Sequence, residues 1–416
     1  MSPVRHWLGT SSHESWLRAE ELRLLGFARN VVRPDGMAAW LDEAGSPDAT
    51  RPALTWITAR MAHVHYLGSL RGVPGCDLIA RRLMQGLATV ARDSEFGGWN
   101  ESMPADPEAD KSAYTHAFVI LAAATGTMAG DETAHAVLAD ALAMTDDRFW
   151  EPEFGRFADA WSHDWAELRT YRGMNANMHL VEAMLAATDA TSDVQWARRA
   201  VGICEYVLDC ASKNGWRIPE HFDERWVADL EFNRDSPADQ FKPYGATVGH
   251  AFEWSRLIAQ AAPLSSDPAS FVTGAQSLFS RAVADGWARD GRPGFAYTTD
   301  WVGKPVVSDR LHWVVTEAIA AAAVLEDLTG LDLYVSSYSD WWDYAATYLI
   351  DLDNGSWHHQ LDSMNRPSST VWSGKPDLYH AYQAVLISQL PPSTSVAAGV
   401  VSAMSGGNPA RRSPGR

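Results

Sequence analysis

Six polar residues recur near the starts of helix-like segments, and their types suit proton transfer and the binding of oxygen atoms. They are Arg60, His116, His179, His250, Glu317 and His380. Histidine, with an ordinary pKa of about 6.5, can exchange protons near neutral pH, and arginine can stabilise negative charge developing on oxygen. Burying such groups together costs free energy unless they pair or react. If the fold brings them together, they predict acid–base chemistry on a small substrate.

A seventh residue, Glu253, follows His250 by three positions. In a helix this spacing places both on one face, where the carboxylate can orient the imidazole and raise its pKa. An ordinary pair on a helix surface would have the same spacing. Two histidines from opposite repeats could flank a small substrate between them.

Motifs for other chemistries are missing from the sequence. There is no G-x-G-x-x-G opening a βαβ unit, no phosphate-binding loop and no G-x-S-x-G elbow. No H-E-x-x-H or tight His/Asp cluster is present, so we predict neither a metal nor a cofactor. The three cysteines, Cys76, Cys204 and Cys210, have no metal-ligand spacing and fit a reducing cytoplasm.

Glycine-containing turns divide the chain into units of nearly constant length. Each turn has flanking aromatics and lies between Ala/Leu-rich segments of helical periodicity. Successive spacings are 62, 57, 60, 79 and 61 residues between Gly36, Gly98, Gly155, Gly215, Gly294 and Gly355. Six units of two helices predict an all-α (α/α)6 barrel of six helical hairpins with short β-hairpin or loop insertions. An open solenoid is the alternative, because the sequence does not prove closure.

The fourth unit is longer than its neighbours by about 19 residues. We place the insertion around residues 228–249, which are rich in Asp, Pro, Gly and Lys, and expect a functional loop there. If the units close, the inner helices surround one axis, and the six polar residues converge at one end of the barrel.

The overall composition is that of a globular protein, with 46% hydrophobic residues among 416. The net charge of −18 argues against binding to nucleic acid or to an anionic membrane. The N-terminus lacks the apolar run of a signal peptide, and the apolar runs are too short to cross a bilayer, so we expect a cytoplasmic protein. Residues 1–390 are predicted to form one catalytic domain and residues 391–416 a disordered tail.

Tryptophan is unusually frequent, with 19 residues against 13 Phe and 12 Tyr. Four flank the repeat glycines, where we expect them to pack the hairpins: Trp40, Trp99, Trp216 and Trp357. Three lie close in sequence to the polar set, where their faces could stack on the C–H surface of a sugar: Trp56, Trp313 and Trp372. The excess therefore divides into a scaffold group and a candidate substrate group.

Five segments together carry a specific family pattern: Thr58–Met61, Tyr114–Phe118, Tyr171–Ala183, Tyr244–Leu257 and Lys375–His380. They resemble the N-acylglucosamine 2-epimerase superfamily, and most of all its branch of bacterial mannose and sulfoquinovose isomerases. The resemblance covers about residues 5–390. It implies an (α/α)6 barrel and a metal-independent reaction at C2 of a monosaccharide.

The same resemblance implies that His250 and His380 are the two acid/base residues. By analogy, His380 moves the carbon-bound proton. The residues expected to bind the sugar are Arg60, His179, Glu253, Asn175, His116, Trp56, Trp313, Glu317 and Trp372.

The expected reaction is the isomerisation of mannose and fructose through a cis-enediol(ate) that is reprotonated at C1. Reprotonation at C2 from the other face gives an epimer, so a sugar 2-epimerase of the mannose/glucose or N-acylglucosamine type is an alternative. A sulfoquinovose isomerase is another, although a sulfonate should require an extra cation before the Gly249-His250 motif, where Lys242 stands alone.

Two hypotheses of other classes are a glycoside hydrolase with paired carboxylates and a non-catalytic sugar- or partner-binding repeat protein. The predominance of His and Arg at the repeated positions disfavours the hydrolase. Of the other histidines, we expect a structural role for His63, His65, His358 and His359, while His163 and His221 could reach the rim of a pocket.

Overall fold

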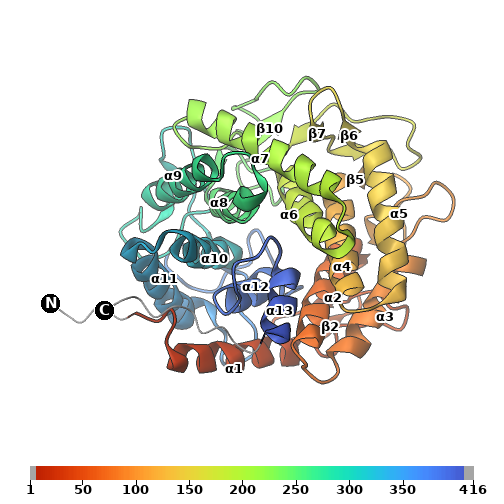
Figure 1. The fold of residues 1–416 in the computed structure, drawn as a ribbon, viewed down its shortest axis with the longest axis horizontal. Coiled ribbons are helices and arrows are strands. Elements are labelled where there is room, and N and C mark those ends of the chain that lie inside the picture. Colours follow the sequence, from red (N-terminus) through yellow and green to blue (C-terminus); the bar gives the residue numbers. More distant parts are fainter. Residues whose placement is uncertain (1–5, 407–416) are drawn as a thin grey trace.

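The computed structural model describes residues 6–406, and within them twelve helices form two concentric rings (Figure 1). The inner ring consists of α2 (Thr55–Leu70), α4 (Ala113–Met128), α6 (Met174–Thr191), α8 (Val248–Ala261), α10 (His312–Thr329) and α12 (Tyr379–Ile387). The outer ring consists of α1 (Ser11–Phe27), α3 (Cys76–Thr89), α5 (Glu132–Arg148), α7 (Val194–Lys213), α9 (Pro268–Gly286) and α11 (Asp332–Tyr344). Each inner helix contacts the next, and α12 contacts α2, so the ring closes. The predicted (α/α)6 barrel is confirmed, and the open solenoid is excluded.

Burial explains which helices lie inside. Almost every residue of α4 is buried, since it contacts its inner neighbours α2 and α6 and its outer neighbour α5. On outer helix α7 the buried residues recur every three or four positions, including Trp196, Ala200, Ile203, Cys204 and Val207. The first outer helix, α1, packs against the last inner helix, α12, so the two ends of the chain complete the ring.

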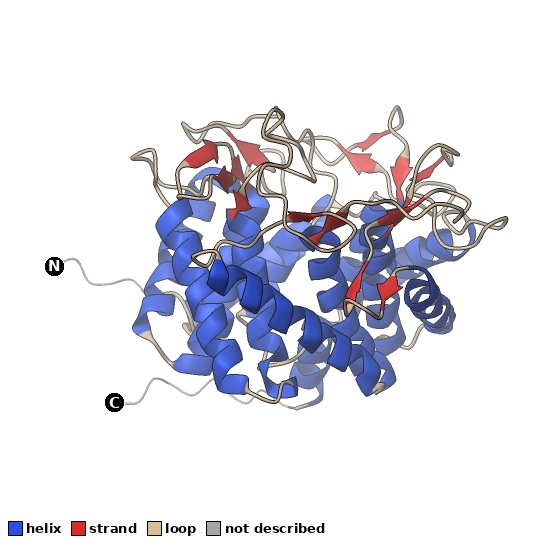
Figure 2. Ribbon diagram, turned by 90° about the horizontal axis from the view of Figure 1, so that it is seen from above, coloured by secondary structure: helices blue, strands red, loops and turns tan. Residues whose placement is uncertain are grey.

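Short strands gather at one end of the barrel (Figure 2). Five inner helices begin directly after a strand, and that strand pairs with the loop of the following unit, as Leu54 pairs with Ser102. This strand pairing holds the N-termini of the inner helices together at the end of the barrel where the strands lie, which is called the strand end below. The strands are β1 (Trp40–Leu41), β2 (Pro47–Asp48), β3 (Ala53–Leu54), β4 (Ser102–Met103), β5 (Lys111–Ser112), β6 (Trp150–Glu151), β7 (Arg156–Phe157), β8 (Ala160–Trp161), β9 (Arg172–Gly173), β10 (His221–Phe222), β11 (Ala246–Thr247), β12 (Thr298–Thr299), β13 (Pro305–Val307), β14 (Arg310–Leu311) and β15 (Gln360–Leu361).

The repeat glycines mark tight turns in the structure. All six have positive φ angles, and at Gly294, with φ of 118°, an added Cβ would lie 2.1 Å from the Arg310 side chain. Trp99 and Trp357 beside these turns are fully buried, and their indole N–H groups donate to Leu87 and Glu20. The predicted scaffold role is therefore confirmed for these two tryptophans.

A thirteenth helix, α13 (Val396–Ser405), lies within the segment predicted to be a disordered tail. Its Val396, Ala397 and Val400 are buried, and it contacts α2, α4, α6 and α12. The prediction of disorder is wrong for residues 396–405. The Ser, Gly and Ala content of this segment is typical of a loop, but its small apolar residues form one buried face of a helix. Of the rest of the predicted tail, residues 391–395 and 406 are described without a helix or strand, and residues 407–416 lie outside the described residues. No helix within residues 6–406 is long and apolar enough to cross a membrane.

The anchor of α13 provides a test of its contribution to stability. Asp189 near the C-terminal end of α6 accepts hydrogen bonds from Thr394, at 2.7 and 2.8 Å, and from Ser395, at 2.6 Å. We expect Asp189→Ala to lower the free energy of unfolding by about 1–3 kcal/mol, measured by urea denaturation. The control Asp147→Ala, at a side chain that is 71% exposed, should change it by less than about 0.5 kcal/mol. Equal effects of the two substitutions would show that the anchor contributes nothing.

Candidate active site

A polar cavity lies at the strand end of the barrel axis, where all six inner helices contribute to its wall or floor. Its lining residues are Arg60, Tyr114, Asn175, His179, Gln240, Phe241, His250, Glu253, Tyr297, His312, Trp313, His359, Trp372, Asp377 and His380. A larger cavity of about 410 Å³ lies at the helical end, but it is mostly apolar, and Asp327 is the one titratable side chain among the described residues that line it. The cavity at the strand end, which is lined by several titratable side chains, is therefore the candidate active site.

Eight of the eleven predicted site residues line this cavity: Arg60, Asn175, His179, His250, Glu253, Trp313, Trp372 and His380. Their convergence follows from the ring, because each lies in the first turns of an inner helix or in a loop above it. The other three predicted residues, His116, Trp56 and Glu317, do not line the cavity.

His116 does not face the axis, so the prediction that it binds substrate is wrong. It is fully buried against Trp99, Phe149 and Trp165. Its Nδ1 lies 2.7 Å from the Ser112 carbonyl, and its Nε2 accepts the Trp99 backbone N–H at 3.3 Å. Tyr114, two residues earlier and so on the opposite side of α4, lines the cavity in its place.

Trp56 and Glu317 lie directly behind the cavity wall. The Trp56 ring packs edge-on against Phe241 and Trp372, with centroids 6.0 and 6.2 Å apart. Phe241 belongs to the predicted insertion at 228–249, so this loop does cover the cavity. Glu317 is buried beneath His380 and contacts it from below.

The two predicted acid/base histidines each have a carboxylate at Nδ1. His380 Nδ1 lies 2.9 Å from Glu317, and His250 Nδ1 lies 3.0 Å from Glu220. Because an ionised carboxylate only accepts hydrogen bonds, each Nδ1 carries the proton and each Nε2 offers a lone pair. The expectation that Glu253 orients His250 is wrong, since Glu220, from the loop before β10, occupies that position. Glu253 faces His179 instead, at 3.6 Å.

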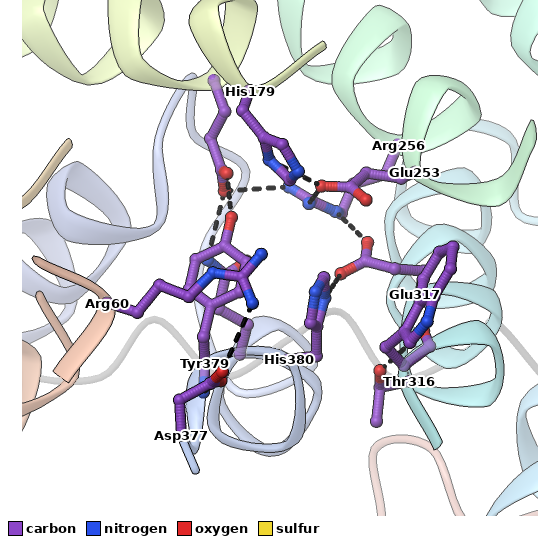
Figure 3. Close-up of polar contacts among 12 residues, drawn as sticks. Arg60, His179, Glu253, Arg256, Thr316, Glu317, Asp377, Tyr379 and His380 are labelled. Atoms are coloured by element: carbon purple, nitrogen blue, oxygen red, sulfur yellow. Dashed lines mark hydrogen bonds and ion pairs between the residues drawn. The ribbon is translucent and has the colours of Figure 1, made fainter. Parts of the chain in front are cut away.

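A buried arginine holds the carboxylates beneath the cavity (Figure 3). The Arg256 guanidinium lies 2.9 Å from Glu317 and 3.6 Å from both Glu182 and Glu253. Gln383 donates to one oxygen of Glu182 at 3.1 Å, and the Tyr379 hydroxyl donates to the other. Burial, together with the negative charge of Glu317, holds the pKa of Glu253 well above its ordinary value.

Two groups of side chains here are close enough to share a metal ion: His179, Glu182 and Glu253, and Glu253, Glu317 and His380. Arg256 already contacts every carboxylate in both groups. A cation placed among them would therefore be repelled by a fixed guanidinium, and the donor sets do not fit a metal centre.

Arg60 is the second guanidinium of the site. It contacts Asp377 at 3.3 Å (Figure 3). It also donates to the Tyr114 hydroxyl at 2.9 Å. Its guanidinium also lies 4.2 Å from the Phe118 ring centroid. Burial, followed by the positive charge of Arg60, holds the pKa values of His179 and His380 well below their ordinary range. Both imidazoles are therefore neutral near pH 7.

Several lining residues were missed in the sequence: Tyr114, Gln240, Phe241, Tyr297, His312, His359 and Asp377. His359, expected to be structural, lines the cavity, so that expectation is wrong. His221, expected at the rim, instead contacts the Tyr171 hydroxyl and the Pro243 carbonyl, and His163 lies 3.4 Å from Asp93. The available signals were the position of His312 directly before Trp313 and the position of Phe241 within the predicted insertion.

Five polar atoms of cavity-lining residues are buried without a hydrogen-bond partner in the described part of the chain. They are Arg60 Nε, His179 Nδ1, Glu253 Oε1, His312 Nε2 and Trp372 Nε1. Buried polar atoms without partners are rare, and each costs free energy. A ligand with several hydroxyl groups would satisfy them, because a hydroxyl both donates and accepts.

The chain matches one family model, and it is similar in sequence and in fold to proteins named D-mannose isomerase. The family model for N-acylglucosamine 2-epimerase matches residues 36–384. The chain is 45% identical to a D-mannose isomerase of Thermobifida fusca over 397 residues, covering 94% of this chain and 98% of that one. It is 42% identical to a D-mannose isomerase of Pseudomonas cannabina pv. alisalensis over 407 residues, with 96% and 97% covered. A crystal structure of a D-mannose isomerase shares the fold, with a TM-score of 0.84 at 24% identity and 92% and 98% covered.

Proposed function

Since the chain belongs to the N-acylglucosamine 2-epimerase family, we propose that this sugar isomerase interconverts D-mannose and D-fructose. The observation that carries the proposal is the pair of histidines His250 and His380, each held by a buried carboxylate. They lie in a cavity whose lining includes polar atoms with no partner in the described residues. The identity to proteins named D-mannose isomerase supports this choice of sugar.

In the proposed reaction, His380 removes the proton from C2 of the open-chain aldose. Its pKa lies below the ordinary range, so the ring is neutral, and Glu317 directs the Nε2 lone pair away from the carboxylate. The C2–H electron pair forms the C1–C2 double bond of a cis-enediol(ate), and the carbonyl electrons move to O1. Return of the proton to C1, with transfer of the O2 proton to O1, gives the ketose.

His250 is proposed to open the sugar ring and to move the hydroxyl protons. Glu220 stabilises the imidazolium that forms when His250 accepts a proton, and its buried Oε1 has no other partner among the described residues. Arg60 supplies positive charge for the oxygen that becomes negative in the enediolate. His179 and Glu253 are proposed to bind sugar hydroxyls on the adjacent wall.

The reaction is proposed to need no metal. Arg256 occupies the centre of the carboxylates that would be the donors, and Arg60 is available for charge on the substrate. The sulfoquinovose alternative is weakened by Lys242, which lies 3.7 Å from Asp159 and 3.9 Å from the Tyr171 ring and does not line the cavity. Among the described lining residues Arg60 is the one Lys or Arg, and Asp377 already pairs with it.

We expect EDTA-treated protein to convert D-mannose to D-fructose at the same rate as untreated protein, followed by NMR. The reason is that Arg256 and Arg60 supply the positive charge that a metal would provide. Formation of glucose alone would identify a 2-epimerase. Formation of neither sugar would refute a reaction at C2 of mannose, and loss of activity on EDTA treatment would refute metal independence alone.

A further inference from the structure

Three imidazoles that line the cavity have no part in the proposed proton transfers, and His312 is one of them. His312 is the first residue of α10, is only 5% exposed and lines the cavity. Its ring centroid lies 6.4 Å from that of His380, within the span of one hexose. Its Nε2 is buried and has no hydrogen-bond partner in residues 6–406.

The tautomer of His312 is determined by its other nitrogen. Nδ1 lies 3.2 Å from the backbone carbonyl of His359, the same oxygen that accepts the His312 backbone N–H at 3.0 Å. A carbonyl oxygen only accepts hydrogen bonds, so Nδ1 carries the proton and Nε2 presents a lone pair. Burial lowers the pKa of His312 to about 4, and its place at the positive end of the α10 dipole also disfavours the charged ring.

The orientation of this ring is held on two sides. The His359 ring stacks on it, with centroids 4.0 Å apart and planes 22° apart. The backbone on either side is fixed by the pairing of β14 with β15, in which Leu311 opposes Gln360. The acceptor at Nε2 therefore keeps one direction, which is the property a residue needs to select one substrate group.

Resting on the proposed function, we infer that His312 Nε2 accepts a hydrogen bond from one hydroxyl of the sugar and makes the site specific for a neutral hexose with that hydroxyl. A deoxy sugar leaves this lone pair buried and unpaired. A sulfonate or ionised phosphate at that position presents only acceptors, so it meets the lone pair with repulsion. His312 is thus a specificity-determining residue.

Two isosteric substitutions separate this role from a structural one. In His312→Asn, the side-chain amide replaces Nδ1 and keeps the bond to the His359 carbonyl, but the Nε2 acceptor is lost. In His312→Gln, the carboxamide oxygen reaches the Nε2 position, but the bond to His359 is lost. His65→Asn is the matched control, because His65 is fully buried on α2 and does not line the cavity, and its ring nitrogens have no hydrogen-bond partner among the residues that the structure describes.

The experiment compares kcat/KM for D-mannose with that for its 3-, 4- and 6-deoxy analogues. We expect the wild type and His65→Asn to discriminate against one analogue by about 10- to 100-fold, the effect of one unpaired buried polar group. His312→Asn should reduce this ratio to about one, and His312→Gln should retain part of it. Undiminished discrimination in His312→Asn, or its loss only in His312→Gln, would overturn the inference. A wild type inactive on mannose would instead refute the proposed function.

Discussion

Replacing His380 with asparagine should lower kcat for mannose isomerisation by about 1000-fold, since a positioned general base contributes roughly 100- to 10,000-fold. The asparagine amide can keep the hydrogen bond to Glu317 while the Nε2 base is lost. His250→Asn, which can likewise keep its bond to Glu220, should also be severely impaired. The rates are measured by coupled assay of fructose, with folding checked by circular dichroism.

The control for this prediction is His65→Asn, which removes a buried imidazole away from the cavity and should retain most of the wild-type kcat. In the wild type, the acid limb of kcat/KM should lie below pH 6.5, because the pKa of His380 lies below that value and the base is lost only when it is protonated. A His380→Asn variant with more than about a tenth of the wild-type kcat would contradict a role for this histidine as the base.

Replacing Arg256 with methionine should destabilise the fold by about 3–5 kcal/mol, the effect of leaving buried charges without their partner. The substitution keeps an unbranched apolar stem but leaves Glu182, Glu253 and Glu317 without the Arg256 guanidinium. The loss should be measured by urea denaturation. Catalysis should fall as well, because Glu317 would no longer be held beneath His380.

The pH dependence of this variant provides a second check. Unfolded glutamates ionise near pH 4.3, whereas burial already holds the pKa of Glu253 above that value, and loss of the Arg256 charge should raise it further. The folded state therefore binds more protons, and its stability should fall as the pH rises above about 4.3, so the deficit relative to wild type is larger at pH 8 than at pH 5. Arg234→Met, which breaks an exposed pair with Glu231, should leave the stability nearly unchanged. Equal stabilities of the Arg256→Met variant and the wild type at pH 8 would show that Arg256 does not neutralise the cluster.

The fold could be predicted from the sequence because its signals are local. The positive φ at Gly36 and Gly294 and the apolar periodicity of the helices act within a few residues, and repetition at a nearly constant spacing reveals the number of units. The same repetition places His250 and His380 at equivalent helix starts. Their convergence in one cavity then follows from ring closure.

By itself, the sequence determined the barrel, the end at which polar residues meet and most of the residues that line the cavity. Only the tertiary structure decided their partners. Glu220 replaces Glu253 beside His250, Arg256 joins carboxylates from three helices, and α13 contacts four inner helices although its composition suggested a loop. Helical spacing relates residues within one turn or two, whereas the contacts of His250 with Glu220 and of Arg256 with Glu317 join residues 30 and 61 positions apart, where packing rather than periodicity determines which side chains meet.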